Sequence, residues 1–98
     1  MTSKQRSYLK GLAQTTESLF QIGKSNLTPE ITNAIEEAFN THELLKITVL
    51  KNATDNPNEM AKVLAERTHS SVVQVIGRKI VIYKPDSKNP KIILPKEK

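Results

Sequence analysis

The stretch that decides the fold is SLFQIGKSNLTPEITNAIEEAF, residues 18–39. It begins with residues 18–22, whose apolar side chains are spaced as in a short strand, and Gly23 ends that strand. Thr28 is a good N-cap, and Pro29 suits the first helical position, where its missing N–H has no cost. Apolar residues then recur at helical spacing to position 39, on one face. The stretch predicts a strand, a turn and a helix that packs on a core.

Helix signals recur on both sides of this stretch. Thr2 and Gln5 have the spacing of a capping box, which predicts a helix near the N-terminus. Asn56 followed by Pro57 repeats the cap-then-proline start, so a third helix is predicted there. No glycine ends that helix, and we expect His69 or a neighbour to take a left-handed conformation.

Three more strands are predicted from β-branched and apolar runs at residues 44–51, 72–76 and 80–83. The last two are joined across residues 77–79 as a hairpin, and their nearly continuous apolar character suits the middle of a covered sheet. Residues 86–98 are rich in Lys, Pro and Asn and are expected to form a basic tail or an edge segment. The order α-β-α-β-α-β-β predicts a small α/β sandwich, with residues 1–98 as a single domain.

Composition excludes several classes of protein. The 98 residues contain no cysteine, which excludes disulfide frameworks, and three glycines are too few for a dinucleotide or Walker A loop. The two histidines are far apart without neighbouring ligands, so neither a metal nor another cofactor is expected. No apolar run is long enough for a membrane span and no signal peptide is visible, so we expect a cytoplasmic monomer.

The net charge of +5 is unevenly distributed along the chain. Residues 1–24 hold four basic residues against one acidic, and residues 78–98 hold seven against two. Residues 25–45 hold four glutamates and no Lys or Arg. Basic ends around an acidic middle favour an anionic partner, above all nucleic acid.

The turn Gly23-Lys24-Ser25-Asn26 carries the most chemistry. Gly23 lets a phosphate backbone approach closely, Lys24 adds a cation, and Asn26 tolerates a positive φ. A following helix start attracts anions through its free N–H groups, although Glu30 would compete with a phosphate there. An ordinary strand-to-helix turn would have the same composition.

Six separated blocks of the chain, covering about residues 2–95, closely resemble the CRM domain (chloroplast RNA splicing and ribosome maturation) in its single-domain bacterial form, the YhbY type. The blocks are 4–13 (KQRSYLKGLA), 21–24 (QIGK), 42–46 (HELLK), 65–68 (AERT), 73–78 (VQVIGR) and 80–85 (IVIYKP).

The resemblance implies a mixed four-stranded sheet packed with helices, in two layers or sandwiched, similar to the C-terminal domain of bacterial translation initiation factor three. It also implies RNA binding through a GxxG loop and association with precursors of the large ribosomal subunit. Carried over, the loop is Gly23 to Asn26. Asn26 replaces the usual glycine and adds a side chain where RNA would pass.

We therefore expect a non-enzymatic RNA-binding protein, in which Lys24 and the loop amides hold phosphates. Tyr8 and Tyr83 are candidates for base stacking, whereas core packing is expected for at least Phe20 and Phe39. The alternative is a basic adaptor that docks an acidic protein, whereas no base, nucleophile or metal cluster supports an enzyme. The RNA interface requires the first helix and the last hairpin to share a face with the loop. Electrostatic reach is expected from a basic face formed by Lys4, Arg6, Lys10, Lys46, Arg78, Lys79 and Lys84.

Overall fold

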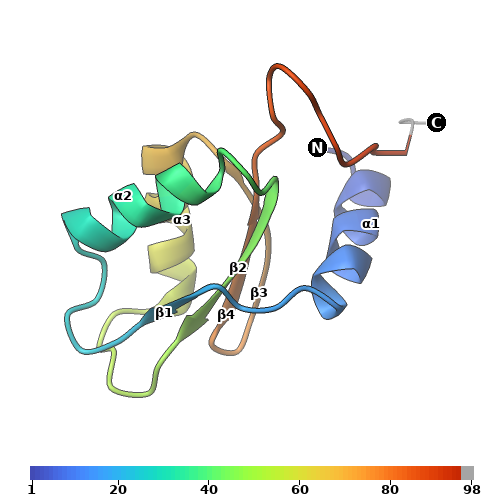
Figure 1. Cartoon of the computed structure of the whole chain (residues 1–98). Helices are drawn as coiled ribbons and strands as arrows, with labels where there is room; N and C mark the ends of the chain where they lie inside the picture. Colours follow the sequence, from blue (N-terminus) through green and yellow to red (C-terminus); the bar gives the residue numbers. More distant parts are fainter. Residues whose placement is uncertain (96–98) are drawn as a thin grey trace.

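Figure 1 shows the computed structural model of the protein, which describes residues 1–95. Within these residues, helices and strands alternate in the predicted order. The elements are α1 (Ser3–Gln14), β1 (Phe20–Ile22), α2 (Pro29–Ala38), β2 (Leu44–Val49), α3 (Pro57–Thr68), β3 (Ser71–Ile76) and β4 (Lys79–Tyr83).

The four strands form one mixed sheet in the order β1-β2-β4-β3. β1 runs parallel to β2, whereas β4 is antiparallel to both β2 and β3. The register pairs Thr48 with Lys79 near one end of the sheet and Leu44 with Tyr83 at the other. We call these the loop end (residues 23–28, 50–56 and 77–78) and the tail end (residues 39–43 and 84–95).

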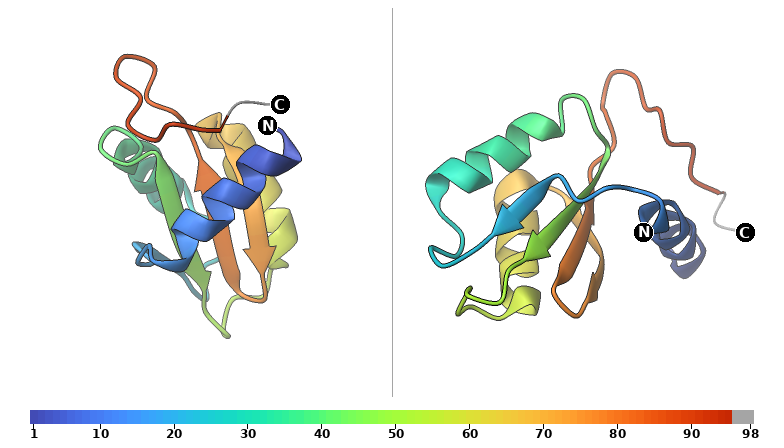
Figure 2. Two further views of the ribbon diagram at one scale, coloured as in Figure 1. Left: turned by 90° about the vertical axis from the view of Figure 1, so that its right-hand side faces the viewer. Right: turned by 60° about the horizontal axis from the view of Figure 1, so that its bottom comes forward.

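Helices cover both faces of the sheet, so the arrangement is the sandwiched one (Figure 2). α2 and α3 lie on one face, over a core that includes Ile35, Leu45 and Ile82. α1 lies alone on the other face, over a smaller core that includes Leu9 and Val81. Because strand side chains alternate between faces, β2 and β4 supply both cores.

The predicted helix signals are confirmed. The Thr2 and Gln5 side chains form a reciprocal capping box, and Thr28 and Asn56 each cap a helix that begins with proline. His69 ends α3 with a φ of 55°, in the left-handed region.

The structure corrects the placement of β3, which lies at an edge of the sheet and not in its middle. β2 and β4 each pair on both sides, whereas β3 pairs only with β4 and contains an irregularity between Val72 and Gln74. Val73 packs beneath α1, and the extra residue at the bulge keeps Val72 and Val75, three positions apart, together on the α2–α3 core; the two cores together account for the continuous apolar run. The predicted strands at 18–22 and 44–51 are shorter, since residues 18, 19, 50 and 51 lie outside β1 and β2.

Residues 84–95 leave β4, loop out at the tail end and return to α1 without forming a helix or strand (Figures 1 and 2). Ile92 and Leu94 pack on the core beneath α1. The Gln5 side-chain amide donates to the Pro95 carbonyl at 3.2 Å. The predicted tail is therefore docked as far as residue 95, and its last three residues lie outside the described part.

Glu43 fixes this return path. Its buried carboxylate accepts backbone N–H bonds from Asp86 (2.8 Å), Lys91 (2.7 Å) and Ile92 (2.6 Å). Burial acts to raise the pKa of Glu43, but the three amide hydrogen bonds outweigh it and hold that pKa below the ordinary glutamate value. Sequence reasoning counted Glu43 only as part of the acidic middle.

Candidate nucleic-acid interface

The loop of residues 23–26 forms a tight turn at the loop end of the sheet. The Asn26 N–H donates to the Gly23 carbonyl at 2.9 Å, and Asn26 has a φ of 56°. Asparagine adopts this left-handed conformation more readily than most residues that carry a side chain. Asn26, which the sequence indicated would tolerate a positive φ, thus adopts one.

The side chain of Asn26 ties the turn to the loop between β2 and α3. Its Oδ1 accepts from the N–H groups of Thr54 and Asp55, each at 3.0 Å, and its Nδ2 donates to the Thr54 hydroxyl at 3.0 Å. These bonds commit the amide to a neighbouring loop. Asn26 therefore acts as a tether between two loops, which gives the departure from glycine a structural role.

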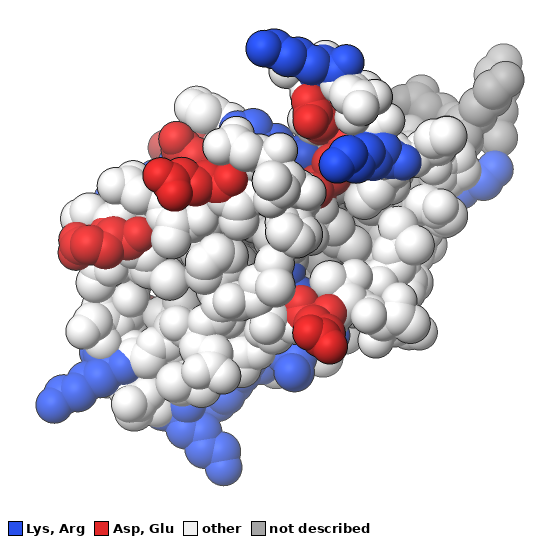
Figure 3. Space-filling view, viewed as in Figure 1, with Lys and Arg blue, Asp and Glu red and all other residues white. Residues whose placement is uncertain are grey.

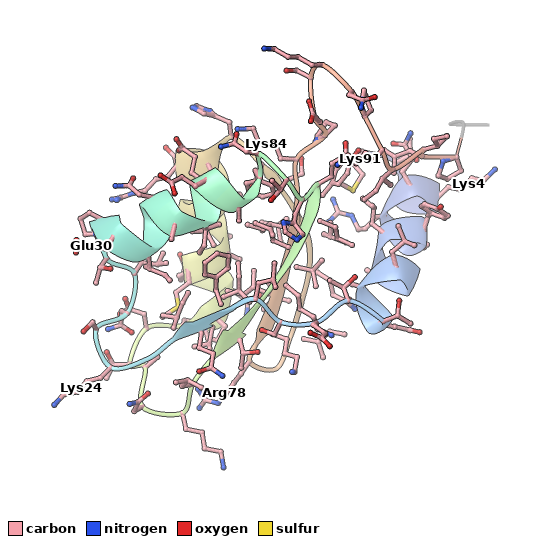
Figure 4. All side chains as sticks on the ribbon, viewed as in Figure 1. Lys4, Lys24, Glu30, Arg78, Lys84 and Lys91 are labelled. Atoms are coloured by element: carbon pink, nitrogen blue, oxygen red, sulfur yellow. The ribbon has the colours of Figure 1, made fainter. Side chains whose placement is uncertain are left out.

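Gly23 lies close against the same neighbouring loop. A Cβ at this position would come within 3.3 Å of the Asn52 side-chain oxygen and 3.5 Å of Leu50 Cδ1. A larger residue would have to push these side chains aside. Lys24 and Ser25 are exposed, and Figure 4 shows Lys24 reaching out from the turn.

The start of α2 contributes less to anion binding than the sequence suggested. α2 begins three residues after the turn, at Pro29, which has no N–H. The Ile31 N–H is already taken by the Thr28 hydroxyl at 3.2 Å. Glu30 is exposed in the first turn, as expected (Figure 4). Donors for a phosphate would therefore come from the turn itself.

The β3–β4 hairpin and the turn both contact Leu50 at the loop end. Arg78 Nη1 donates to the Leu50 carbonyl at 3.2 Å, and Leu50 is the residue that lies beside Gly23. Figure 4 shows Lys24 and Arg78 at the same end of the molecule, and basic side chains gather there in Figure 3. The hairpin therefore lies at the same end as the turn, as expected, whereas the basic residues of α1 do not join them there.

Lys51, exposed in the β2–α3 loop next to Leu50, adds a third basic residue to the loop end. Sequence reasoning missed it because it was assigned to the end of a strand. A usable signal was present, because Lys51 directly follows Leu50, the last apolar residue of the run, and such a position is typical of an exposed loop.

Three of the predicted basic residues lie together on the α1 face of the sheet. Lys10, Lys46 and Lys79 line one shallow hollow of about 130 Å³ between α1 and the strands. Lys46 Nζ also donates to the Ala13 carbonyl in the last turn of α1, at 3.1 Å. A cation near a helix C-terminus stabilises the helix dipole, so Lys46 fastens α1 to β2.

Arg6 is engaged in packing. Its Nη1 donates to the carbonyls of Val72 (2.6 Å) and Val73 (3.1 Å), at the bulge in β3. A bulge interrupts the ladder and leaves backbone groups without strand partners. Arg6 thus fastens α1 to β3.

Lys4 and Lys84 lie apart from Lys24 (Figure 4). Lys4 is in the first turn of α1, and Lys84 lies at the tail end with its Nζ 5.9 Å from the centre of the Phe39 ring. The seven predicted basic residues thus form separate groups and not one continuous face. Of the two tyrosines, Tyr83 is buried and belongs to the core beneath α1, whereas Tyr8 is exposed.

No membrane-spanning or metal-binding feature occurs in the described residues. Within residues 1–95, no helix combines the length and apolar character needed to cross a bilayer. In the same part of the chain, His, Asp and Glu side chains do not gather in a group that could hold a metal ion.

The chain matches known proteins over nearly its whole length. A model of the CRS1/YhbY (CRM) domain matches residues 1–84. The chain belongs to the CRS1/YhbY (CRM) domain family. Similar CRM proteins include the probable RNA-binding protein YqeI of Bacillus subtilis, 36% identical over 97% of this chain and 99% of that protein. An RNA-binding protein of Haemophilus influenzae is 33% identical over 99% of this chain and 97% of its own length.

The CRM fold is also shared with a solved structure. The solution structure of the hypothetical protein SAV1595 from Staphylococcus aureus superposes with a TM-score of 0.82 at 41% sequence identity. The match covers 97% of this chain and 99% of SAV1595.

Proposed function

We propose that this CRM protein binds RNA without catalysing a reaction on it and acts, as a cytoplasmic monomer, in assembly of the large ribosomal subunit. Its similarity to proteins named as RNA-binding proteins supports the choice of RNA. The family resemblance supports the association with precursors of the large subunit. A sequence pI near 9.6 suits a polyanionic partner.

The observation that carries the proposal is the arrangement of the loop end. Lys24, Lys51 and Arg78 are all exposed, and they come from three loops of which the β2–α3 loop, with Lys51, contacts the other two. Within residues 1–95, no carboxylate forms an ion pair with any of them. An exposed cluster of cations without acidic partners attracts phosphates, and Lys24 and Ser25 are the exposed residues through which the turn can meet one.

The direct test is Lys24→Glu, measured by fluorescence anisotropy with a large-subunit ribosomal RNA precursor. We expect the affinity to fall by about ten-fold, since a charge-assisted contact contributes about 1.5 kcal/mol or more. The matched control is Lys88→Glu, which makes the same charge change at an exposed site of the tail end. Equal affinities for Lys24→Glu and the unaltered protein would refute the assignment of the turn.

Nuclease treatment separates RNA from an acidic protein as the partner. The proposal expects this protein to co-sediment with large-subunit precursors and to lose that association when the RNA is digested. Persistence after digestion would favour the adaptor alternative.

A further inference from the structure

The hollow on the α1 face of the sheet is lined by apolar and amide side chains that have no role in the proposed phosphate binding. It lies between the C-terminal half of α1 and strands β2, β3 and β4. Its apolar surface comes from Ala13, Val81 and Ile76. Ala13 and Val81 are buried, but the Ile76 side chain is 61% exposed at the edge of β3. A large aliphatic side chain is thus left open to solvent beside a packed apolar floor.

The rim of this hollow is polar and carries only positive charge. Lys10, Lys46 and Lys79 surround it, and no acidic residue lines it. Two side-chain amides, of Gln14 and Gln74, complete the lining. Within residues 1–95, neither amide has a hydrogen-bond partner, and none of the three lysines forms an ion pair. Each amide can therefore offer a donor and an acceptor to a ligand.

The size of the hollow limits its occupant. A volume of about 130 Å³ is close to that of an engineered protein cavity of about 150 Å³ that holds one benzene molecule. One flat ring fits such a space, whereas a folded peptide element does not. The positive rim further favours a ring that is attached to anionic groups.

The hollow is also connected to the loop end through adjacent residues. Lys79 follows Arg78, which hydrogen-bonds Leu50, and Leu50 lies beside Gly23. A single strand held by its phosphates at the loop end could pass over the hairpin to the α1 face. Proteins that read single-stranded RNA commonly take bases that are splayed out from the strand.

We propose that this hollow receives one unpaired nucleobase of the bound RNA, with the ring on Ile76 and Val81 and its polar edge against Gln14 and Gln74. Lys10 and Lys79 hold the flanking phosphates, since Lys46 is engaged with the Ala13 carbonyl. This inference rests on the proposed RNA-binding function and adds a base-binding site on the sheet face opposite α2 and α3.

The test combines an altered protein with an altered RNA. Ile76→Ala shortens an exposed side chain, and Ile93→Ala, at a side chain that is 82% exposed in the C-terminal segment, is the matched control. The probe is an unstructured, mixed-sequence oligoribonucleotide, together with versions in which one nucleotide at a time is made abasic while its phosphate is retained. Affinities are measured by fluorescence anisotropy at one salt concentration.

We expect Ile76→Ala to lower the affinity for intact RNA by about five-fold, because apolar area against the base is lost, and Ile93→Ala to leave it unchanged. Removing the base at one position of the RNA should weaken its binding to the unaltered protein. The same change should have little further effect on the RNA affinity of the Ile76→Ala variant. Additive losses at every position, or an unchanged affinity for Ile76→Ala, would overturn the base site.

The same measurements separate the two proposals. Suppose that Lys24→Glu weakens binding but that the losses of affinity from Ile76→Ala and from each abasic nucleotide are simply additive. The phosphate site then stands and the base site fails. If the unaltered protein binds neither the oligoribonucleotide nor the ribosomal RNA precursor, both proposals fail. An acidic peptide that competes with RNA only when Ile76 is intact would reassign the hollow to a protein partner.

Discussion

The two ends of the sheet carry similar numbers of basic side chains but use them differently. At the loop end, Lys24, Lys51 and Arg78 are exposed and have no acidic partners among residues 1–95. At the tail end, a hollow of about 490 Å³ is lined by acidic and basic groups together, including Glu36 and Lys84. Charge without a counter-charge is available to a ligand, whereas charge engaged within the fold is not.

The tail end shows what engaged charges do. Glu43 holds the returning chain by three backbone amides, and Asp86 accepts from the N–H groups of Lys88 and Asn89. These two amide bonds lower the pKa of Asp86. Lys84 lies over the Phe39 ring. The net charge of +5 therefore overstates how widely an RNA could be held.

The largest effect is expected when the loop end loses its charge. In the triple variant Lys24→Gln, Lys51→Gln and Arg78→Gln, RNA affinity should fall by about a hundred-fold. The slope of log K against log salt should become less negative by roughly two, because each single-strand phosphate contributes about 0.7 to its magnitude. Salt titrations followed by anisotropy measure both. The control neutralises three lysines of the tail end, Lys84, Lys88 and Lys91. Similar losses in both variants would mean that net charge and not its placement controls binding.

The next effect concerns stability at the tail end. Glu43→Ala removes the acceptor of three backbone N–H groups and should lower the free energy of unfolding by about 3 kcal/mol. Chemical denaturation measures this, and exposed Glu37→Ala is the control, with a change below about 0.5 kcal/mol. RNA affinity of the folded Glu43→Ala protein should be unchanged, because the loop end lies at the other end of the sheet. A loss of affinity equal to that of the triple variant would mean that RNA binding depends on both ends of the sheet.

The lowered pKa of Glu43 also predicts a pH dependence. Since the folded pKa lies below the unfolded value of about 4.3, the stabilisation is complete above that value and is lost as the pH falls through the folded pKa. Unfolding measured from about pH 6 down to about pH 3 should show a steeper loss for the unaltered protein than for Glu43→Ala. Parallel curves would contradict a role for the ionised carboxylate.

A smaller effect is expected at the tether between the loops. Asn26→Ala loses three hydrogen bonds and places alanine at a φ of 56°, whereas Asn26→Gly loses the bonds but accepts the conformation. The alanine variant should be less stable than the glycine variant by about 1 kcal/mol. Thermal unfolding measures the stability of the two variants, and the unaltered protein should be more stable than both. If glycine proves the most stable of the three, the tether does not stabilise the turn.

The smallest effect is expected at Lys84. Lys84→Ala removes a cation from the face of Phe39 and should lower the free energy of unfolding by less than about 1 kcal/mol, with RNA affinity unchanged. Lys24→Ala should show the opposite pattern. Its RNA affinity should be lower, and its free energy of unfolding should be unchanged because the Lys24 side chain is exposed. Denaturation and anisotropy on the same samples measure both. A clear loss of RNA affinity in Lys84→Ala would extend the interface to the tail end.

Local sequence signals predicted the helices well, because caps and prolines act within a few residues. Thr28 with Pro29, and Asn56 with Pro57, satisfy the first N–H groups of a helix wherever it is packed. His69 took the left-handed conformation for the same local reason, the lack of a glycine after Thr68. Strand positions were harder to predict, since burial of the β3 valines depends on a bulge and on partners far away in the sequence.

The sequence by itself determined the order of helices and strands, because caps, prolines and apolar runs act between neighbours in the chain, and its six separated blocks indicated the family. Only the tertiary structure decided which charges are available. Arg6 at the β3 bulge, Lys46 at the end of α1 and Glu43 beneath the returning tail have partners 33 to 67 positions away. Whether a charge is engaged or free depends on such distant contacts, which no local pattern reveals.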